Sequence, residues 1–336
     1  VSLSGRSMPV HPSFGISNLC RLKGAFVRYP VAKSIILSPP LCDLVPSRQS
    51  GSQGRWYKLK PFIIAPVIFI VLVGGIYAYS GVWPPMVVVE SKSMQHSDRS
   101  SIGVIDTGDI VMVRSVGSAD EVVTYLRGVA TGHSTYGEPG DVIIYHKSGM
   151  SRPIIHRAIA ALEYNATGGG FDVPELANVP ASMWSVPGGD RAWWNLKDSV
   201  ELYGIGFLKV TVIIDLKAML DYMRSPAYSG EPHGGLITMG DNNYYTGVDG
   251  TLLGKYDQRW LGSMREPIKS EWIVGKARGE LPWFGLIKLY ATGTAPDYTP
   301  ENSKVDLVIA LALIIVVPIA IDVLQAVVRG RSGRNE

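Results

Sequence analysis

Three short polar clusters carry residue types that could act together in nucleophilic catalysis. They are Ser91-Lys92-Ser93-Met94, His156-Arg157 and Gly240-Asp241-Asn242-Asn243. A serine hydroxyl attacks a carbonyl only when a neighbouring base takes its proton, and a neutral imidazole oriented by a carboxylate suits that role. The clusters therefore predict a nucleophile, a base and an orienter that the fold brings together.

Spacing alone does not choose the base. The chain has six histidines, and His96 lies only three positions after Ser93, so it is an alternative base to His156. Lys92 and Lys147 are interpreted as solvated charges rather than as a lysine base. Asp241 after a glycine and Asp249 before one also fit ordinary turn positions, and both stay open as the orienting carboxylate.

The element that precedes the serine cluster is an uncharged apolar segment, Pro61 to Trp83. At about 1.5 Å per residue, a helix of this length crosses a hydrocarbon core of roughly 30 Å. We predict a transmembrane helix over 58–83. Ala78 and Ser80 also allow a cleaved secretory signal, but sixty residues precede the segment, which disfavours that alternative.

A second apolar block predicts another transmembrane helix over 304–328. Its uncharged part, Leu307 to Ile321, is short and lies between Asp306 and Asp322, so a buried core helix is the alternative. Basic residues near a span favour the cytoplasmic face. They precede the first block and follow the second, which predicts two crossings with both termini cytoplasmic: Arg48, Arg55, Lys58, Lys60, Arg329, Arg331 and Arg334.

The terminal segments carry no hydrophobic period. Residues 1–57 are expected to be a poorly ordered cytoplasmic tail, and 329–336 a short basic one. Cys20 and Cys42, the only cysteines, lie in the first tail, so the external part is predicted to have no disulfide and no thiol nucleophile. The net charge of +3 is too small to indicate nucleic acid binding.

Between the spans, short β-rich runs bounded by Gly-Asp pairs predict a mainly β, antiparallel catalytic domain in two parts, 84–160 and 236–300. The interval 161–235 is interpreted as an inserted lobe, with one helix expected over 216–224. Three tryptophans could form its core or a face touching lipid headgroups: Trp184, Trp193 and Trp194. Asn165-Ala166-Thr167 is a glycosylation pattern, used or unused.

Four boxes in the right order carry a family resemblance. Ser91-Lys92-Ser93-Met94 resembles the Ser-x-Ser-Met box of type I signal peptidases, and the segment from Pro153 to Ile159 resembles their next box. Thr238 to Asn243 resembles the Gly-Asp-Asn-Asn box, and Val274 to Pro282 the Val-Gly-Arg-Ala-x-Gly-x-Leu-Pro strand. His156 stands where the bacterial branch has lysine, which is typical of the archaeal and endoplasmic-reticulum branch.

The resemblance implies a signal-peptidase-like β domain and assigns roles. Ser93 would attack, His156 would accept its proton, and Asp241 or Asp249 would orient the imidazole. Ser91 would stabilise the oxyanion together with the Ser93 backbone N–H. The sequence departs from the family at Lys92, where glycine is usual, and at Gln95-His96.

The resemblance further implies substrates and partners. The substrates would be secretory preproteins with a hydrophobic signal segment and small residues at −3 and −1, cut at the extracytoplasmic face of the bilayer without cofactor or metal. The protein-export channel is a further possible partner. The expected location is a cell membrane of the archaeal type, with the endoplasmic reticulum as the alternative. Two other functions also stay open: a catalytically silent β module that binds preproteins, and a serine hydrolase or acyltransferase with other acyl donors.

Overall fold

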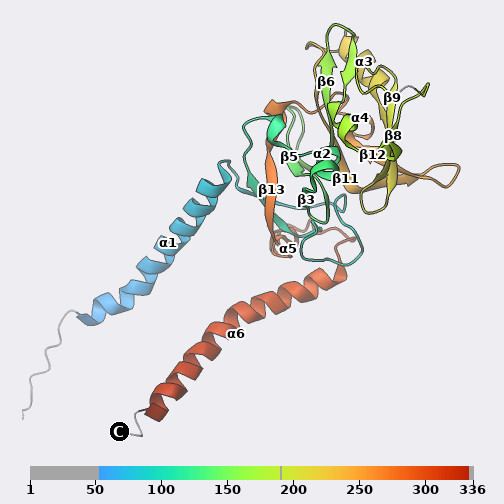
Figure 1. Cartoon of the computed structure of the whole chain (residues 1–336). Coiled ribbons are helices and arrows are strands. Elements are labelled where there is room, and N and C mark those ends of the chain that lie inside the picture. The colour runs from blue at the N-terminus through green and yellow to red at the C-terminus, as the bar shows by residue number, and fades with distance from the viewer. Residues whose placement is uncertain (1–52, 190, 333–336) are drawn as a thin grey trace, which may run out of the picture. The chain divides into compact units, whose positions relative to one another are not determined.

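The structure is a computed structural model that describes residues 53–189 and 191–332 (Figure 1). The predictions for Cys20, Cys42 and almost all of the N-terminal tail lie outside these residues. The region contains two helices long and apolar enough to cross a membrane and a β-rich domain between them in sequence.

One mixed sheet of eleven strands forms the framework, in the order β1-β2-β13-β5-β6-β11-β12-β10-β9-β8, with β7 paired to β6. The strands are β1 (Met86–Val88), β2 (Ile110–Arg114), β5 (Val142–Tyr145), β6 (Ile154–Asn165), β7 (Gly170–Asp172), β8 (Trp184–Ser185), β9 (Ser199–Ile205), β10 (Val210–Asp215), β11 (Gly235–Thr246), β12 (Leu252–Tyr256) and β13 (Ile273–Leu281). A separate hairpin joins β3 (Ser134–Thr135) and β4 (Glu138–Pro139). The expected mainly β domain is confirmed, with one parallel pairing, β10 with β12.

Helices are few outside the apolar segments. They are α1 (Gln53–Ser80), α2 (Tyr125–Thr131), α3 (Leu216–Arg224), α4 (Asp257–Trp260), α5 (Gly285–Ala291) and α6 (Glu301–Ser332), with 3-10 turns at Ala119–Glu121, Pro174–Asn178, Ala181–Met183 and Ser270–Trp272. The expected helix α3 begins where Asp215 accepts a hydrogen bond from the Ala218 N–H. Leu216, Met219, Leu220 and Met223 are buried on one face of α3, as its amphipathic pattern requires.

The two apolar helices differ slightly from their predicted bounds. α1 ends at Ser80 because Gly81 takes a left-handed φ of +69°, while α6 begins at Glu301 and includes Asp306. The side chains of Val308 and Ile314 are 66% and 59% exposed, so α6 is not a core helix of the domain. Mean hydropathy of 2.4 over Phe62–Ser80 and 3.0 over Glu301–Val328 fits a lipid environment.

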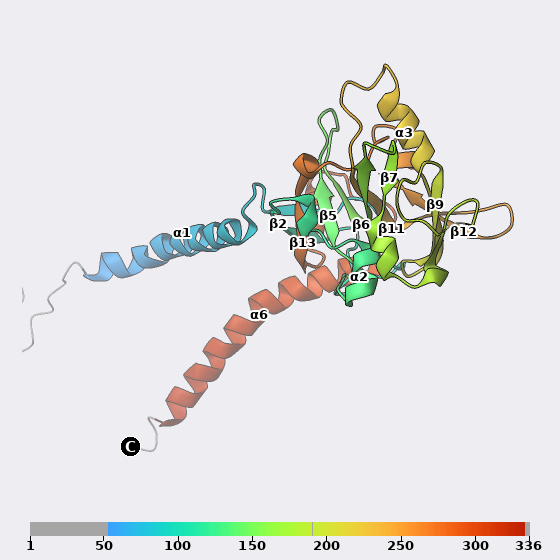
Figure 2. The ribbon, with the colours of Figure 1, turned by 45° about the horizontal axis from the view of Figure 1, so that its top comes forward.

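The interval predicted as an inserted lobe, 161–235, continues the main sheet. β6 runs through the expected boundary at 160, and Thr211 of β10 lies opposite Leu253 of β12. Figure 2 shows β5, β6 and β11 side by side in the middle of the sheet. A shared apolar core therefore spans both regions, including buried Phe171, Leu202 and Ile237.

The three tryptophans do not form a common core. Trp184 is 5% exposed and belongs to the core, whereas Trp194 is 54% exposed and packs edge-on against half-buried Trp193. Asn165 ends β6, and its side-chain amide donates hydrogen bonds to Asp172 at 3.1 and 3.2 Å. In the folded chain this amide is therefore engaged.

Gly140 lies in the turn that leads into β5, and its lack of a side chain is essential to the packing there. Its φ is +84°, and an added Cβ would lie 2.6 Å from the Tyr125 backbone nitrogen. We expect Gly140→Ala to lower the unfolding temperature in detergent, because it adds a backbone clash to the strain of about 1–2 kcal/mol that positive φ causes.

Gly149→Ala is the matched control for this prediction. Gly149 has φ +90° with nothing within 4 Å of the added Cβ, so it carries the conformational strain alone. Equal losses of thermal stability in the two variants would contradict the packing argument.

Candidate active site

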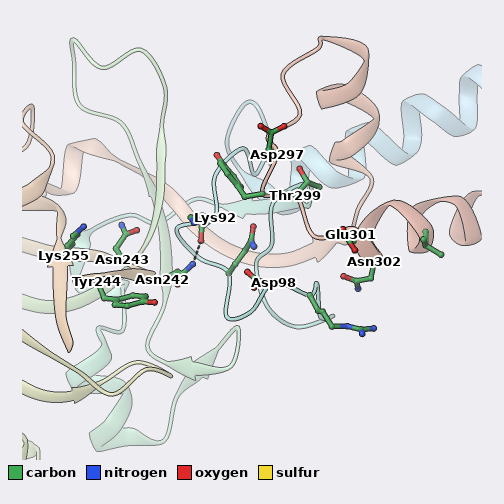
Figure 3. A pocket seen from close by; sticks show the side chains of 14 residues that line it. Lys92, Asp98, Asn242, Asn243, Tyr244, Lys255, Asp297, Thr299, Glu301 and Asn302 are labelled. Carbon is green, nitrogen blue, oxygen red and sulfur yellow. Dashed lines mark hydrogen bonds between the residues drawn. The ribbon is translucent and has the colours of Figure 1, made fainter. Parts of the chain in front are cut away.

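Ser93 lies in a turn that follows β1, and two hydrogen bonds from Asn242 fix this turn. The Asn242 N–H donates to the Ser93 carbonyl at 2.8 Å, and the Asn242 amide donates to the Lys92 carbonyl at 3.2 Å (Figure 3). Met94, 1% exposed, packs in the apolar core below the turn. The Ser93 hydroxyl is therefore presented from a rigid turn rather than from a free loop.

His156 lies on β6 and faces Ser93. Its Nε2 is 3.0 Å from Ser93 Oγ, and the residue is 6% exposed. A neutral imidazole with its proton on Nδ1 accepts from the serine hydroxyl through Nε2. The predicted nucleophile and base are thus in direct contact.

The carboxylate on the other imidazole nitrogen belongs to Asp257, the first residue of α4. Asp257 Oδ2 accepts from His156 Nδ1 at 2.7 Å, from the Tyr145 hydroxyl at 2.6 Å and from Thr238 Oγ1 at 2.6 Å. Burial, and then the Asp257 charge, raise the pKa of Tyr145 far above its usual value, so the phenol stays a donor. Asp257 is 1% exposed and is held by three donors.

The structure places Asp241 elsewhere. Its carboxylate receives the Arg157 guanidinium at 2.8 and 2.6 Å and lies 3.0 Å from His96 Nε2. Burial alone would raise the pKa of Asp241, but the charge and hydrogen bonds of Arg157, with His96, hold it below its usual value. The expected contact of Asp241 with the His156 imidazole is wrong: the partners of Asp241 are Arg157 and His96.

Asp249 does not approach the imidazole either. It lies in the exposed turn between β11 and β12 and accepts from the Thr251 N–H and hydroxyl at 3.1 and 2.8 Å. Asp249 is therefore an ordinary turn residue. Asp257, and neither Asp241 nor Asp249, is the carboxylate that contacts the His156 imidazole.

The hairpin register is the sequence signal that could have identified Asp257. Asp249-Gly250 is a turn dipeptide, and the strand returning from it places Tyr256 opposite Met239. The next residue, Asp257, then lies beside Thr238 and within reach of His156 on the adjoining strand. Reading the return strand to its end would have added this carboxylate to the candidates.

Three other side chains proposed from the sequence, Ser91, His96 and Lys147, have partners of their own. Ser91 Oγ is exposed and lies 3.0 Å from Ser93 Oγ. His96 is directed to Asp241 and stacks on Phe207 with ring centroids 4.3 Å apart. Lys147 forms an ion pair with Glu266 at 2.5 Å, which leaves His156 as the base in contact with Ser93.

A groove of about 1010 Å³ opens at Ser93 and His156. Its walls are largely apolar and come from the exposed edge of β1 and from the start of β6, including Val87, Ile154 and Ile155. Glu90 at one side forms ion pairs with Arg152 and, at 2.9 Å, with Lys288. An extended chain could lie along such an edge strand with its backbone near the serine.

The arrangement can perform acyl transfer by nucleophilic attack. A serine contacts a base, and a buried carboxylate orients that base, which is the geometric requirement of a catalytic triad. Within residues 53–189 and 191–332, no three His, Cys, Asp or Glu side chains are grouped to hold a metal ion.

No family model matches this chain, and no curated protein matches it. Function is therefore inferred from the geometry of the site together with the four sequence boxes.

Three acidic residues lie close together beside the loop that follows the serine turn: Asp106, Asp109 and Glu280. Val89, ahead of the turn, exchanges backbone hydrogen bonds with the chain at Gly108 and Asp109 at 3.0 and 2.9 Å. Burial, only partly offset by N–H donors at Trp283 and Asp106, raises the pKa of Asp109 to about 7. The folded protein thus binds a proton that the unfolded chain releases near pH 4.

This carboxyl makes stability depend on pH. The stabilisation that Asp109 contributes to the folded state is complete below the pKa of this carboxyl in the unfolded chain. It is lost as pH rises through about 7, so the wild-type unfolding temperature should fall between pH 5 and 8. Asp109→Asn cannot titrate and should show a shallower fall over the same range. Asp98→Asn, at an exposed carboxylate, is the control and should keep the wild-type slope; equal slopes in all three proteins would contradict the assignment.

Proposed function

We propose that this chain is a membrane-anchored serine endopeptidase that removes signal peptides from exported preproteins. The observation that carries the proposal is the continuous hydrogen-bond relay from Ser93 Oγ through His156 to Asp257. The four boxes that resemble type I signal peptidases support it, since two of them supply Ser93 and His156 and a third supplies the strand that fixes the Ser93 turn.

The mechanism follows from the geometry. Ser93 Oγ attacks the scissile carbonyl while its proton passes to His156 Nε2, and Asp257 stabilises the imidazolium that forms. Collapse of the tetrahedral intermediate expels the amine of the mature chain, which takes the proton from His156. Water, activated by the same imidazole, then hydrolyses the acyl-enzyme ester and regenerates the serine.

The proposed substrate fits the groove. Its apolar walls beside β1 suit an extended segment with small side chains near the cut, and the edge of β1 can pair with that segment's backbone. Five residues separate the end of α1 from the start of β1, so the groove follows a membrane-length helix closely in sequence. We place the domain on the extracytoplasmic side, with both termini cytoplasmic, on the basis of the flanking basic residues.

Ser93→Ala, His156→Ala and Asp257→Asn should each remove cleavage of a tagged preprotein by purified enzyme in detergent. We expect losses of about 10³-fold or more for the serine and histidine variants and about 10²- to 10⁴-fold for the aspartate variant, since the imidazole then loses its tautomer and its counter-charge. Steady-state kinetics give the measurement.

Asp249→Asn is the matched control and should cut within about twofold of wild type, because its side chain contacts only its own turn. Full activity in Ser93→Ala would overturn the proposal in favour of another nucleophile. Binding of preproteins without cleavage by the wild type would favour a silent binding module.

Ser91→Ala tests the oxyanion assignment. Loss of one donor to a developing oxyanion typically costs about 10²- to 10³-fold in kcat with little change in KM. Ser91→Thr, which keeps the hydroxyl, should retain more activity than alanine. A change confined to KM would instead make Ser91 a substrate-binding residue.

A further inference from the structure

A second pocket, the polar cleft, lies on the other side of the serine turn and has more polar walls than the apolar groove. It has a volume of about 1220 Å³ and polar walls (Figure 3). The walls come from three places: the turn and the loop after it, the end of β11 with Lys255 of β12, and the segment that begins α6. Its charged side chains are Lys92, Asp98, Arg99, Lys255, Asp297 and Glu301.

The polar cleft and the apolar groove meet beside Ser93 and His156. Asn243 lines both of them, while Lys92 lines the polar cleft and its neighbour Ser93 lines the groove. A Cβ placed on Gly240 would lie 2.8 Å from Asn243 Nδ2 and 2.9 Å from His156 Nε2, so the Asn243 amide is beside the imidazole. A peptide with its carbonyl at Ser93 and one arm in the groove can continue into the cleft with its other arm.

The segment that begins α6 is hydrogen-bonded to the chain on both sides of the serine turn. Asn302, in the first turn of α6, accepts from the Ser100 N–H at 2.9 Å and donates to the Ser100 carbonyl at 3.0 Å. The Tyr298 hydroxyl donates to the Glu90 carbonyl at 3.2 Å, and Lys92 lies over the Tyr298 ring. The cleft is therefore pre-formed, with the start of α6 as part of the site.

The charged side chains come from three parts of the cleft, with Lys92, Asp98 and Arg99 on the serine turn and the loop after it. Lys255 lies next to Asn243 and is held over the rings of Tyr245 and Trp260, whereas Asp297 and Glu301 line the opposite wall (Figure 3). Such walls solvate polar and charged side chains better than aliphatic ones. A fixed cation on one side and carboxylates on the other also give a bound chain a preferred charge pattern.

We propose that this cleft binds the first residues of the mature chain, on the C-terminal side of the cut, and that it selects polar and charged side chains there. Lys255 favours acidic residues, and Asp297 with Glu301 favours basic ones. The inference rests on the proposed peptidase function and adds a specificity site to it.

The test uses three preproteins that differ only at the second and third residues after the cut, which are Glu-Glu, Lys-Lys or Ser-Ser. The ratio of kcat/KM for the Glu-Glu and Lys-Lys substrates is measured in detergent for wild type, Lys255→Glu and Asp297→Lys. Lys255→Glu should lower this ratio about three- to tenfold and Asp297→Lys should raise it, with both shifts reduced at high salt. The Ser-Ser substrate reports whether each variant is folded and active.

Lys217→Glu, on the solvent-exposed face of α3, is the matched charge reversal and should leave the ratio at the wild-type value. Ratios within twofold of wild type in both cleft variants, with the Ser-Ser substrate still cut, would overturn the cleft assignment and leave the peptidase proposal standing. Failure of the wild type to cut any of the three substrates would overturn both.

Discussion

The hydrogen bond between His156 Nδ1 and Asp257 Oδ2 is the interaction on which the site depends. It fixes the imidazole proton on Nδ1, which leaves Nε2 free to accept from Ser93. A buried carboxylate is costly unless it is fully hydrogen-bonded, and Tyr145 and Thr238 supply the further donors that make its burial possible. The adjoining strands β5, β6 and β11 therefore each supply a hydrogen-bond donor to one oxygen, Oδ2 of Asp257 on α4.

The sheet explains why these groups meet. β6 carries His156, its neighbours β5 and β11 carry Tyr145 and Thr238, and the return strand β12 delivers Asp257. A second buried cluster pairs Arg157, the residue after His156 on β6, with Asp241, three residues after Thr238 on β11. It binds four backbone carbonyls of the segment from Thr135 to Gly140 as well as His96, so it braces the loop that follows the serine. A buried pair of this kind fixes geometry more than it adds stability.

Much of this arrangement could be predicted from the sequence, and the rest depends on register. The membrane-length segments follow from composition, the β character follows from short alternating runs, and Ser93 and His156 follow from local boxes. Asp257 could not be chosen locally, because its role comes from a hairpin of β11 and β12 whose bulges set the pairing. Asp241 was the better local candidate, but its carboxylate is hydrogen-bonded to Arg157 and His96 instead of His156.

The acyl-enzyme is the species that tests this account most directly. A preprotein mixed with enzyme, quenched in acid within milliseconds and analysed by peptide mass mapping, should show the signal segment as an ester on Ser93. The adduct should be lost in His156→Ala and should form far more slowly in Asp257→Asn. An adduct on another residue, or rapid turnover with no adduct at Ser93 at any quench time, would contradict the relay from Ser93 through His156 to Asp257.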